Sequence, residues 1–189
     1  MQNSRTFMML FSVICIVLNL VLGTLVSFLN IPLIFMDTMG TMIAAIAFGP
    51  FWGGTVGLLT NVIQGFLTNP VNIPFALVNM TIGIVTGLVV RKWGYSLKVA
   101  VATGLVLSVV APLIGTPIVV WIYGGLTGSS TDFFVGWLLA SGQRIFAAAF
   151  IPRVAGNLID KVASALIAWV IIRKMPPDIL GKMTTYDPR

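Results

Sequence analysis

Few side chains in this sequence could do chemistry, and the ionisable ones among them stand inside long apolar stretches. These groups are Asp37, Arg144, Arg153, Asp160 and Lys161. A charge at membrane depth costs a few kcal/mol on insertion scales, so such groups usually face a cavity or one another. They are therefore candidates for binding a polar ligand.

Each of these groups also has a structural interpretation. Asp37 could stand at the entrance of a helix in contact with water, because a loop closely precedes it. Asp160 and Lys161 could each form an ion pair with Arg153 or Asp37. Because adjacent helix positions point about 100° apart, Asp160 and Lys161 need not pair with each other.

A second group of candidates combines amides with aromatic rings. Asn61 and Gln64 are three residues apart and share a helix face. Buried amides can simply tie helices together, and Trp and Tyr at a membrane interface are usually anchors. Convergence on one side of the bilayer favours a pocket for a small, flat, polar ligand. The predicted substrate site comprises Asp37, Asn61, Gln64, Asn72, Asn79, Trp121, Tyr123, Arg144, Asp160 and Lys161.

Motifs of catalysis and metal binding are missing from the sequence. It contains no phosphate-binding glycine loop with Lys-Ser/Thr, no nucleophile elbow and no metal-binding pair on a helix. It has no His, and Cys15 is its single cysteine, which excludes an intramolecular disulfide. We expect no enzyme activity, no ATP hydrolysis by this chain alone, no cofactor and no metal.

The composition is that of a membrane protein. Hydrophobic residues make up 58% of the 189 residues and charged residues 8%, with a mean hydropathy of +1.03, whereas soluble domains carry roughly 25% charged residues. The net charge of +6 does not indicate a nucleic-acid partner, because the cations mostly stand where apolar segments end. No polar stretch divides the chain, so residues 1–189 form one predicted domain.

The apolar segments predict an all-α protein with about six transmembrane helices. The first segment is too long for the apolar part of a signal peptide, so we interpret it as a span. Residues 35–66 are too long for one crossing and break at Gly49-Pro50. Pro112 and Pro117 predict a kink or an unwound stretch in the fifth span. The spans are 7–29, two within 35–66, 74–90, 97–123 and 154–172.

Residues 132–151 are ambiguous, since they are apolar but end at Pro152-Arg153. Counting them as a seventh span would place the cationic tail outside. We therefore predict a short outer-side or re-entrant helix before the last span, and both termini in the cytoplasm. Eight of the eleven cations then lie inside: Arg5, Arg91, Lys92, Lys98, Arg173, Lys174, Lys182 and Arg189.

Small residues recur four apart in three segments. The pairs are Gly40 with Ala44, Gly53 with Gly57, and Gly83 with Gly87. This spacing lets helix backbones approach closely, either within the bundle or against a partner membrane protein. Packing within the bundle is the commoner use.

Two stretches resemble the substrate-binding S components of energy-coupling factor (ECF) vitamin transporters, which are prokaryotic ABC-type importers. Residues 47–58, AFGPFWGGTVGL, followed by Asn61 and Gly65, are similar to the connection between helices 2 and 3 of many S components. Residues 157–168, NLIDKVASALIA, look like the last helix of uncharacterised members. Size and the six-span layout agree with the resemblance.

The resemblance implies a multi-pass protein of the prokaryotic cell membrane that binds a vitamin or related micronutrient from outside. It implies toppling in the bilayer on a membrane scaffold (T) subunit driven by two cytoplasmic ATPase subunits. Such S components often show two alanines four apart on helix 1 as the docking surface. This chain departs from that pattern: Gly23 and Ser27 have the spacing on helix 1, and Gly40 and Ala44 have it on helix 2.

Two other classes stay open at this point. A membrane sensor could use a similar bundle to bind a small ligand without transport, and it should continue into a cytoplasmic enzyme domain. A membrane-embedded enzyme would need clustered acids or histidines, and the sequence has five acids. The substrate is also open: cations near the outer mouth indicate an anionic or strongly hydrogen-bonding group, while riboflavin, pyridoxine, and thiamin or its precursors all remain in range.

Overall fold

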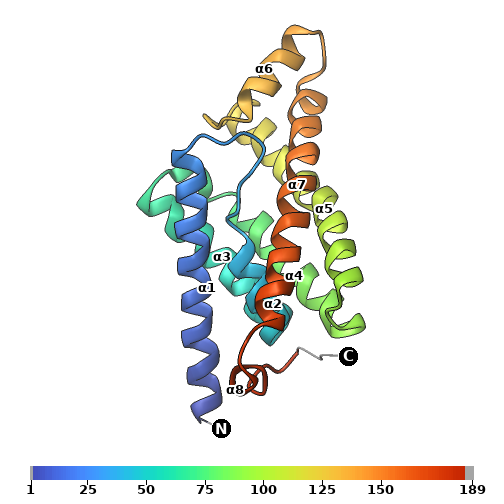
Figure 1. Ribbon diagram of the computed structural model, residues 1–189. Helices are drawn as coiled ribbons and strands as arrows, with labels where there is room; N and C mark the ends of the chain where they lie inside the picture. The colour runs from blue at the N-terminus through green and yellow to red at the C-terminus, as the bar shows by residue number, and fades with distance from the viewer. Residues whose placement is uncertain (1, 186–189) are drawn as a thin grey trace.

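The structure is a computed structural model that describes residues 2–185, with side chains from residue 5 onward. Within this range the chain folds into helices joined by turns and loops, while Arg189, one of the predicted cytoplasmic cations, lies outside it. The elements (Figure 1) are α1 (Gln2–Phe28), α2 (Met39–Phe48), α3 (Pro50–Leu67), the 3-10 turn η1 (Pro70–Asn72), α4 (Ala76–Trp93), α5 (Leu97–Tyr123), α6 (Asp132–Ala140), α7 (Ile145–Arg173) and α8 (Pro177–Leu180).

Four helices are long and apolar enough to cross a membrane, namely α1 from Arg5 onward, α4, α5 and α7. α3 also has 18 residues, but it contains Asn61, Gln64 and four glycines and is not among those four. α2 has ten residues, about 15 Å of helix against a hydrocarbon core of about 30 Å. Four of the six predicted spans therefore qualify. The two that do not are α2, because residues 35–38 form a loop and the helix begins only at Met39, and α3.

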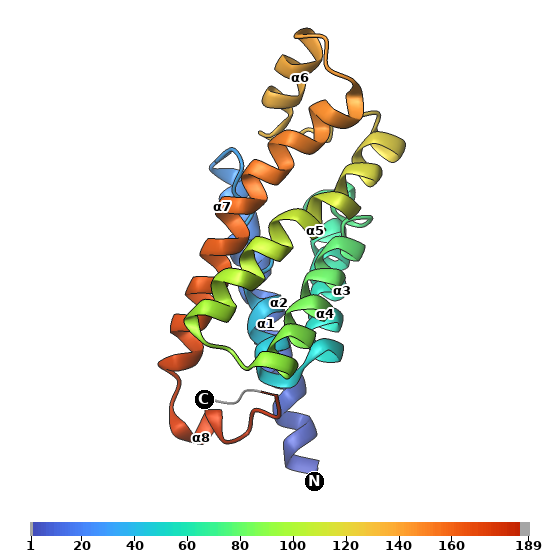
Figure 2. The same ribbon diagram turned by 90° about the vertical axis from the view of Figure 1, so that its right-hand side faces the viewer.

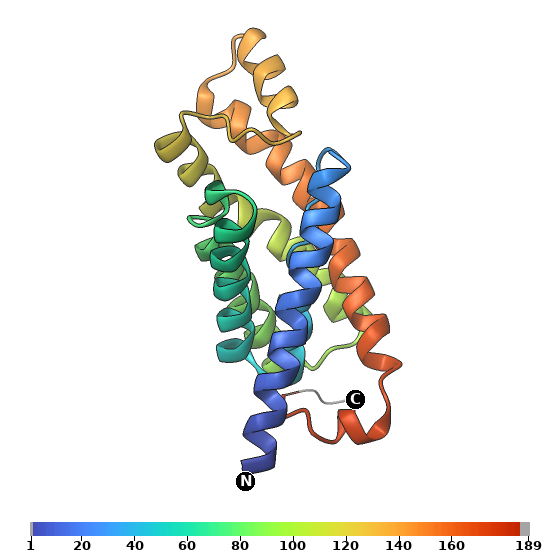
Figure 3. The same ribbon diagram turned by 90° about the vertical axis from the view of Figure 1, so that its left-hand side faces the viewer.

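The short α2 lies in the middle of the bundle. All ten of its residues are buried, and it contacts α1, α3, α4 and α7. The most extensive helix contacts join α5 to α7 and α3 to α4. Three views show α6 at one end of the bundle and α8, with the start of α1, at the other (Figure 1, Figure 2 and Figure 3). We call the two ends the α6 half (residues 23–38, 61–82 and 111–161) and the α8 half (residues 39–60, 83–100 and 164–183).

Glycines let α3 and α4 lie against each other. A Cβ atom at Gly83 would collide with the backbone of Gly53, and one at Gly87 with the backbone of Pro50. Gly57 lies equally close to the backbone of α4. The glycine pairs four apart on these two helices thus serve contacts within the chain.

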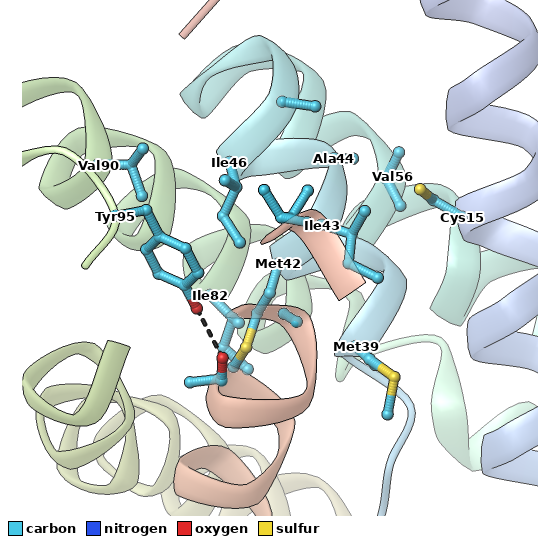
Figure 4. Close-up of a cluster of buried hydrophobic side chains, with 14 of the residues drawn as sticks. Cys15, Met39, Met42, Ile43, Ala44, Ile46, Val56, Ile82, Val90 and Tyr95 are labelled. Carbon is cyan, nitrogen blue, oxygen red and sulfur yellow. Dashed lines mark hydrogen bonds between the residues drawn. The ribbon is translucent and has the colours of Figure 1, made fainter. Parts of the chain in front are cut away.

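Apolar side chains fill the α8 half. Met42 and Ile46 of α2 are fully buried, and Figure 4 shows them in one cluster with side chains of the neighbouring helices. Tyr95, between α4 and α5, is buried in the same cluster and donates a 2.9 Å hydrogen bond to the carbonyl oxygen of Ala165 in α7 (Figure 4). This end of the bundle is therefore a packed core.

The segment after α7 covers this core at the end of the bundle opposite α6 (Figure 1). Met183 is buried against the apolar cluster. The backbone N–H groups of Thr184 and Thr185 donate to the carbonyl oxygen of Ala47 at 2.9 and 3.1 Å, near the end of α2. The segment thereby satisfies a terminal helix carbonyl that α2 itself leaves without a partner.

The ambiguous segment 132–151 belongs to two helices. α6 ends at Ala140, and α7 begins at Ile145 and runs on through Pro152. The predicted break at Pro152-Arg153 and the predicted start of the last span at Val154 are therefore wrong. Proline removes one helix hydrogen bond, and a membrane helix packed along a neighbour, as α7 is along α5, tolerates that loss.

α5 also contains prolines, Pro112 and Pro117, and it remains one helix from Leu97 to Tyr123. Its axis bends between its two halves (Figure 2). The sequence alternatives were a kink or an unwound stretch, and the helix takes the first of these.

Candidate functional site

A cavity of about 550 Å³ lies in the α6 half, between α1, α3, α4, α5 and α7. Pockets for small ligands typically measure about 300–1,000 Å³. The loop between α1 and α2, the turn η1 and the loop before α6 complete its wall. Its charged and amide-bearing lining residues are Asn30, Asp37, Asn61, Gln64, Asn69, Asn72, Asn79, Arg153, Asn157 and Lys161.

One face of α7 supplies three of the lining side chains. Arg153, Asn157 and Lys161 follow one another at intervals of four residues, so they form a row along the helix. All three are buried. The row gives the cavity polar groups along its length on the α7 side.

The loop between α1 and α2 is held in an unusual backbone conformation. Asn30, Leu33 and Met36 have positive φ angles of 51°, 66° and 51°, which are uncommon for residues other than glycine. Asp160 of α7 fixes the end of this loop, because its Oδ1 accepts hydrogen bonds from the backbone N–H groups of Phe35 at 3.0 Å and Met36 at 2.8 Å. The loop therefore forms a fixed wall of the cavity.

Lys161 pairs with two carboxylates at the base of this loop. Its Nζ lies 2.6 Å from Asp160 Oδ2 and 3.8 Å from Asp37 Oδ1, and it donates to Thr38 Oγ1 at 3.0 Å. The sequence left the pairing of Asp160 with Lys161 open and named Asp37 as one alternative partner; Lys161 pairs with both, because its long, flexible stem brings the ammonium back to its neighbour. Such partners allow a buried charge to remain ionised.

A hydrogen-bonded amide network forms the floor of the cavity. Asn19 Nδ2 of α1 donates to Thr41 Oγ1 at 2.9 Å and to Thr60 Oγ1 at 3.0 Å. Thr41 Oγ1 donates to Asn79 Oδ1 at 2.8 Å, and Asn79 Nδ2 donates to Asn61 Oδ1 at 2.7 Å. The network joins α1, α2, α3 and α4, so Asn61 and Asn79 have a structural task as well as a place in the lining.

Gln64 differs from these two amides. Its side chain is buried and lines the cavity, and it makes no hydrogen bond to any residue that the structure describes. On α7, Asn157 Nδ2 donates to the carbonyl oxygen of Arg153 at 2.8 Å, which leaves its Oδ1 free to accept. Both amides have capacity left for a guest molecule.

Six of the ten predicted site residues line the cavity, and the structure brings them together from the α1–α2 loop, α3, η1, α4 and α7. They are Asp37, Asn61, Gln64, Asn72, Asn79 and Lys161. The other four do not line it. Asp160 is buried behind the wall, and Trp121 and Arg144 are exposed on the outside of the bundle. Tyr123 stacks on Phe75, a lining residue, and donates to the carbonyl oxygen of Val71 at 3.3 Å.

Three of the four residues predicted for docking to a partner, Gly23, Gly40 and Ala44, are buried in this chain. Gly23 and Ser27 line the cavity, and a Cβ atom at Gly23 would lie 3.2 Å from Gln64 Nε2. Gly40 abuts the backbone carbonyl of Cys15 in α1, and Ala44 is fully buried. Gly23, Gly40 and Ala44 are therefore packed within the bundle, whereas Ser27 is exposed, so that docking through Ser27 stays a prediction.

The sequence argument missed part of the site. It places Arg153 among the ionisable candidates but not in the predicted site, and it gives no role to Asn157 or Asn19. For the two α7 residues a signal existed, because polar residues at 153, 157 and 161 share one face of an otherwise apolar helix. For Asn19, a single amide in the apolar first helix, no spacing indicated its partners.

Comparison with family models places the whole bundle in one family. Residues 7–172 match the model of the ECF transporter substrate-specific component, a range that covers most of α1 and nearly all of α7 together with everything between them. Comparison with curated proteins and with solved structures found no match. With its cavity inside a bundle of apolar helices, this chain belongs to the ECF transporter substrate-specific components, the membrane subunits that bind the substrate in micronutrient uptake.

Proposed function

We propose that this protein is the high-affinity binding subunit for uptake of a vitamin or related small micronutrient, which it delivers to an ATP-driven ECF module. The observation that carries the proposal is the cavity of about 550 Å³, with buried charges and a partner-free amide in an apolar bundle. Groups of this kind are costly in a membrane unless they serve a ligand or one another. The substrate residues we propose are Asp37, Asn61, Gln64, Asn72, Asn79, Asn157 and Lys161.

The proposal includes six crossings, although α2 is short. Residues 29–38 run from the end of α1 down to α2, and the loop together with α2 makes up one crossing. Irregular backbone at membrane depth is tolerated where it is buried in protein or lines a cavity. The hydrogen bonds from Phe35 and Met36 to Asp160 support this placement.

The distribution of cations supports an orientation with the α6 half outside. Arg91, Lys92 and Lys98 lie around the turn between α4 and α5, and Arg173, Lys174 and Lys182 lie at the end of α7 and beyond it. Short cationic segments stay in the cytoplasm. The cavity then faces the exterior, from which a nutrient arrives.

The proposed partners are a membrane scaffold (T) subunit and two cytoplasmic ATPase subunits. ATP is used by those ATPases, and this chain contributes the captured substrate. Of the four residues predicted for docking, Ser27 is exposed and stays in the proposed docking face, whereas Gly23, Gly40 and Ala44 are buried within this chain.

Two measurements test the proposal. The full-length protein, purified in mild detergent from cells grown in rich medium, should carry a small molecule that mass spectrometry identifies. Reconstituted in liposomes with the scaffold and ATPase subunits, it should take up that molecule only when ATP is supplied to the ATPases. Absence of any bound molecule, or uptake without the module, would refute the proposal.

A further inference from the structure

The cations of the α6 half differ in what neutralises them. Lys161 stands between Asp160 and Asp37. Arg144 is exposed and lies outside the cavity lining. Arg153 is 7% exposed and lines the cavity, and within the described residues no carboxylate forms an ion pair with it at 4.0 Å or less. Of these three cations, Arg153 is the buried one without a counter-ion.

Most of the hydrogen-bonding capacity of Arg153 is also unused. A guanidinium carries five N–H donors. One of its nitrogens, Nη1, donates to the carbonyl oxygen of Ala149 at 2.8 Å, one turn earlier in α7. The guanidinium makes no other hydrogen bond to the part of the chain that the structure describes, so its remaining donors are free on a side chain that lines the cavity.

Asp132, the first residue of α6, forms no ion pair with Arg153 among the contacts of the described residues. Its carboxylate is already occupied, because Oδ2 accepts from the backbone N–H groups of Thr127 at 2.7 Å and Gly128 at 2.6 Å. Oδ1 accepts from the hydroxyl of Thr127 at 3.3 Å and from that of Ser129 at 3.4 Å. Asp132 therefore shapes the loop beside the cavity and leaves Arg153 without a direct partner.

We propose that the substrate is an anion whose carboxylate or phosphate group pairs with Arg153. This inference rests on the proposed function and names the substrate class of the same cavity. The planar guanidinium matches carboxylate and phosphate oxygens with two parallel hydrogen bonds. A buried charge without a partner is costly, and a bound anion supplies the missing one.

The position of Arg153 also orients the ligand. It is eight residues from Lys161 along α7, which corresponds to about 12 Å. The anionic group binds toward α6, beside the loop of residues 127–130, and the rest of the molecule extends toward the free amide of Gln64. Lys161 does not compete for the anion, because two carboxylates already neutralise it.

The first test is the charge of the molecule that the purified wild-type protein carries. Small acids and lipids are extracted separately and identified by mass spectrometry. A water-soluble carboxylate or phosphate supports the inference. A neutral or cationic micronutrient overturns it and leaves the proposed function standing, and a phospholipid as the only occupant overturns the inference. A protein without any bound molecule overturns both.

The second test uses probe pairs that differ in one anionic group: pantothenate with panthenol, nicotinate with nicotinamide, biotin with biotinamide, and pyridoxal phosphate with pyridoxal, together with the extracted molecule. The carboxylate and phosphate pairs distinguish the two kinds of anion. For the pair that binds, Arg153→Gln should weaken the anionic member about 10- to 100-fold and leave the neutral member unchanged. Arg153→Lys keeps the charge without the planar fork and should lose less.

Arg91→Gln is the matched control, because it removes one arginine charge at the opposite end of the bundle, where Arg91 is exposed. It should bind every probe as the wild type does. Equal affinity of wild type and Arg153→Gln for the anionic member would overturn the inference. If Arg153→Gln does not fold, the Arg153→Lys affinities and the charge of the wild-type ligand decide.

Discussion

The two halves of the bundle share α3, α4, α5 and α7, but the side chains between these helices differ: small and apolar in the α8 half, polar in the α6 half. In the α8 half, α2 is buried on every side, and glycines of α3 and α4 lie against each other's backbones. In the α6 half, the same α3 and α4 carry Asn61, Gln64 and Asn79, and the space between the helices is a cavity. Small residues bring helices together, and larger polar residues supported by loops keep them apart.

The row on α7 shows the same change within one helix. Arg153, Asn157 and Lys161 line the cavity, whereas Ser164, Ala165 and Ala168 further along α7 are fully buried. The ion pairs of Lys161 mark the boundary between the halves. The α6 half holds buried charges and an amide without a partner among the described residues, which cost stability. We infer that the packed α8 half supplies the stability that offsets this cost.

Removing Asp160 should have the largest effect on the boundary between the two halves, because its carboxylate pairs with Lys161 and also binds the cavity loop. Asp160→Ala takes a carboxylate from Lys161, and it removes Oδ1, the acceptor that the N–H groups of Phe35 and Met36 share. We expect a loss of about 3–5 kcal/mol, seen as a large fall in apparent melting temperature in detergent. Asp178→Ala, which removes an exposed acid of α8, is the control and should melt as the wild type does. Similar melting of the two variants would contradict the role given to Asp160.

Adding one methyl group to each half should show which half is packed. A Cβ atom at Gly87 collides with the backbone of Pro50, whereas Gly136 of α6 has no atom within 4 Å of its Cβ position. Gly87→Ala should therefore destabilise the protein by about 1–3 kcal/mol. Gly136→Ala should stabilise it by about 0.5–1 kcal/mol, because alanine restricts the unfolded chain. Thermal unfolding followed by size-exclusion chromatography measures both. A Gly87→Ala protein as stable as the wild type would show that α3 and α4 can move apart at this contact without loss of stability.

Replacing cavity amides should separate binding from stability. Gln64 has no partner among the described residues, so Gln64→Leu should leave the melting temperature unchanged. It should weaken binding of the co-purified ligand about 10-fold, the effect of one lost hydrogen bond. Asn79→Leu removes a network member that bonds Thr41 and Asn61, so it should lower the melting temperature as well. Titration calorimetry and thermal unfolding of the two variants check this; a Gln64→Leu protein with unchanged affinity would remove Gln64 from the site.

The sequence predicted the helical class, the break at Gly49-Pro50 and the internal use of the glycine pairs, because proline and small residues act locally. It did not predict how short α2 is. Apolar residues 35–38 suit a helix in lipid as well as a loop, and the choice is made by Asp160, which is more than a hundred residues away and binds the loop N–H groups.

The same distinction holds for the cavity. Residue type indicated that Asn61, Gln64 and Lys161 were worth attention, since polar groups are rare in such a sequence. Which of them have spare hydrogen-bonding capacity depends on tertiary contacts, as the network through Asn19 and Asn79 shows. Trp121 illustrates the converse, because its type suits a pocket and its position on α5 turns it outward, where it is 80% exposed.

Two tyrosine hydroxyls, one in each half, give the smallest and most closely matched comparison. Tyr95 is buried in the α8 half and donates at 2.9 Å to Ala165, while Tyr123 is half-buried in the α6 half and donates at 3.3 Å to Val71. Tyr95→Phe should cost about 1 kcal/mol, and Tyr123→Phe about 0.5 kcal/mol or less, because longer and wetter hydrogen bonds contribute less. Both changes keep the ring, so packing is preserved and differences in melting temperature report the hydroxyl groups. If Tyr123→Phe were the more destabilising change, the wall around η1 would be the tighter structure, and the cavity would owe its shape to local contacts rather than to the packed half.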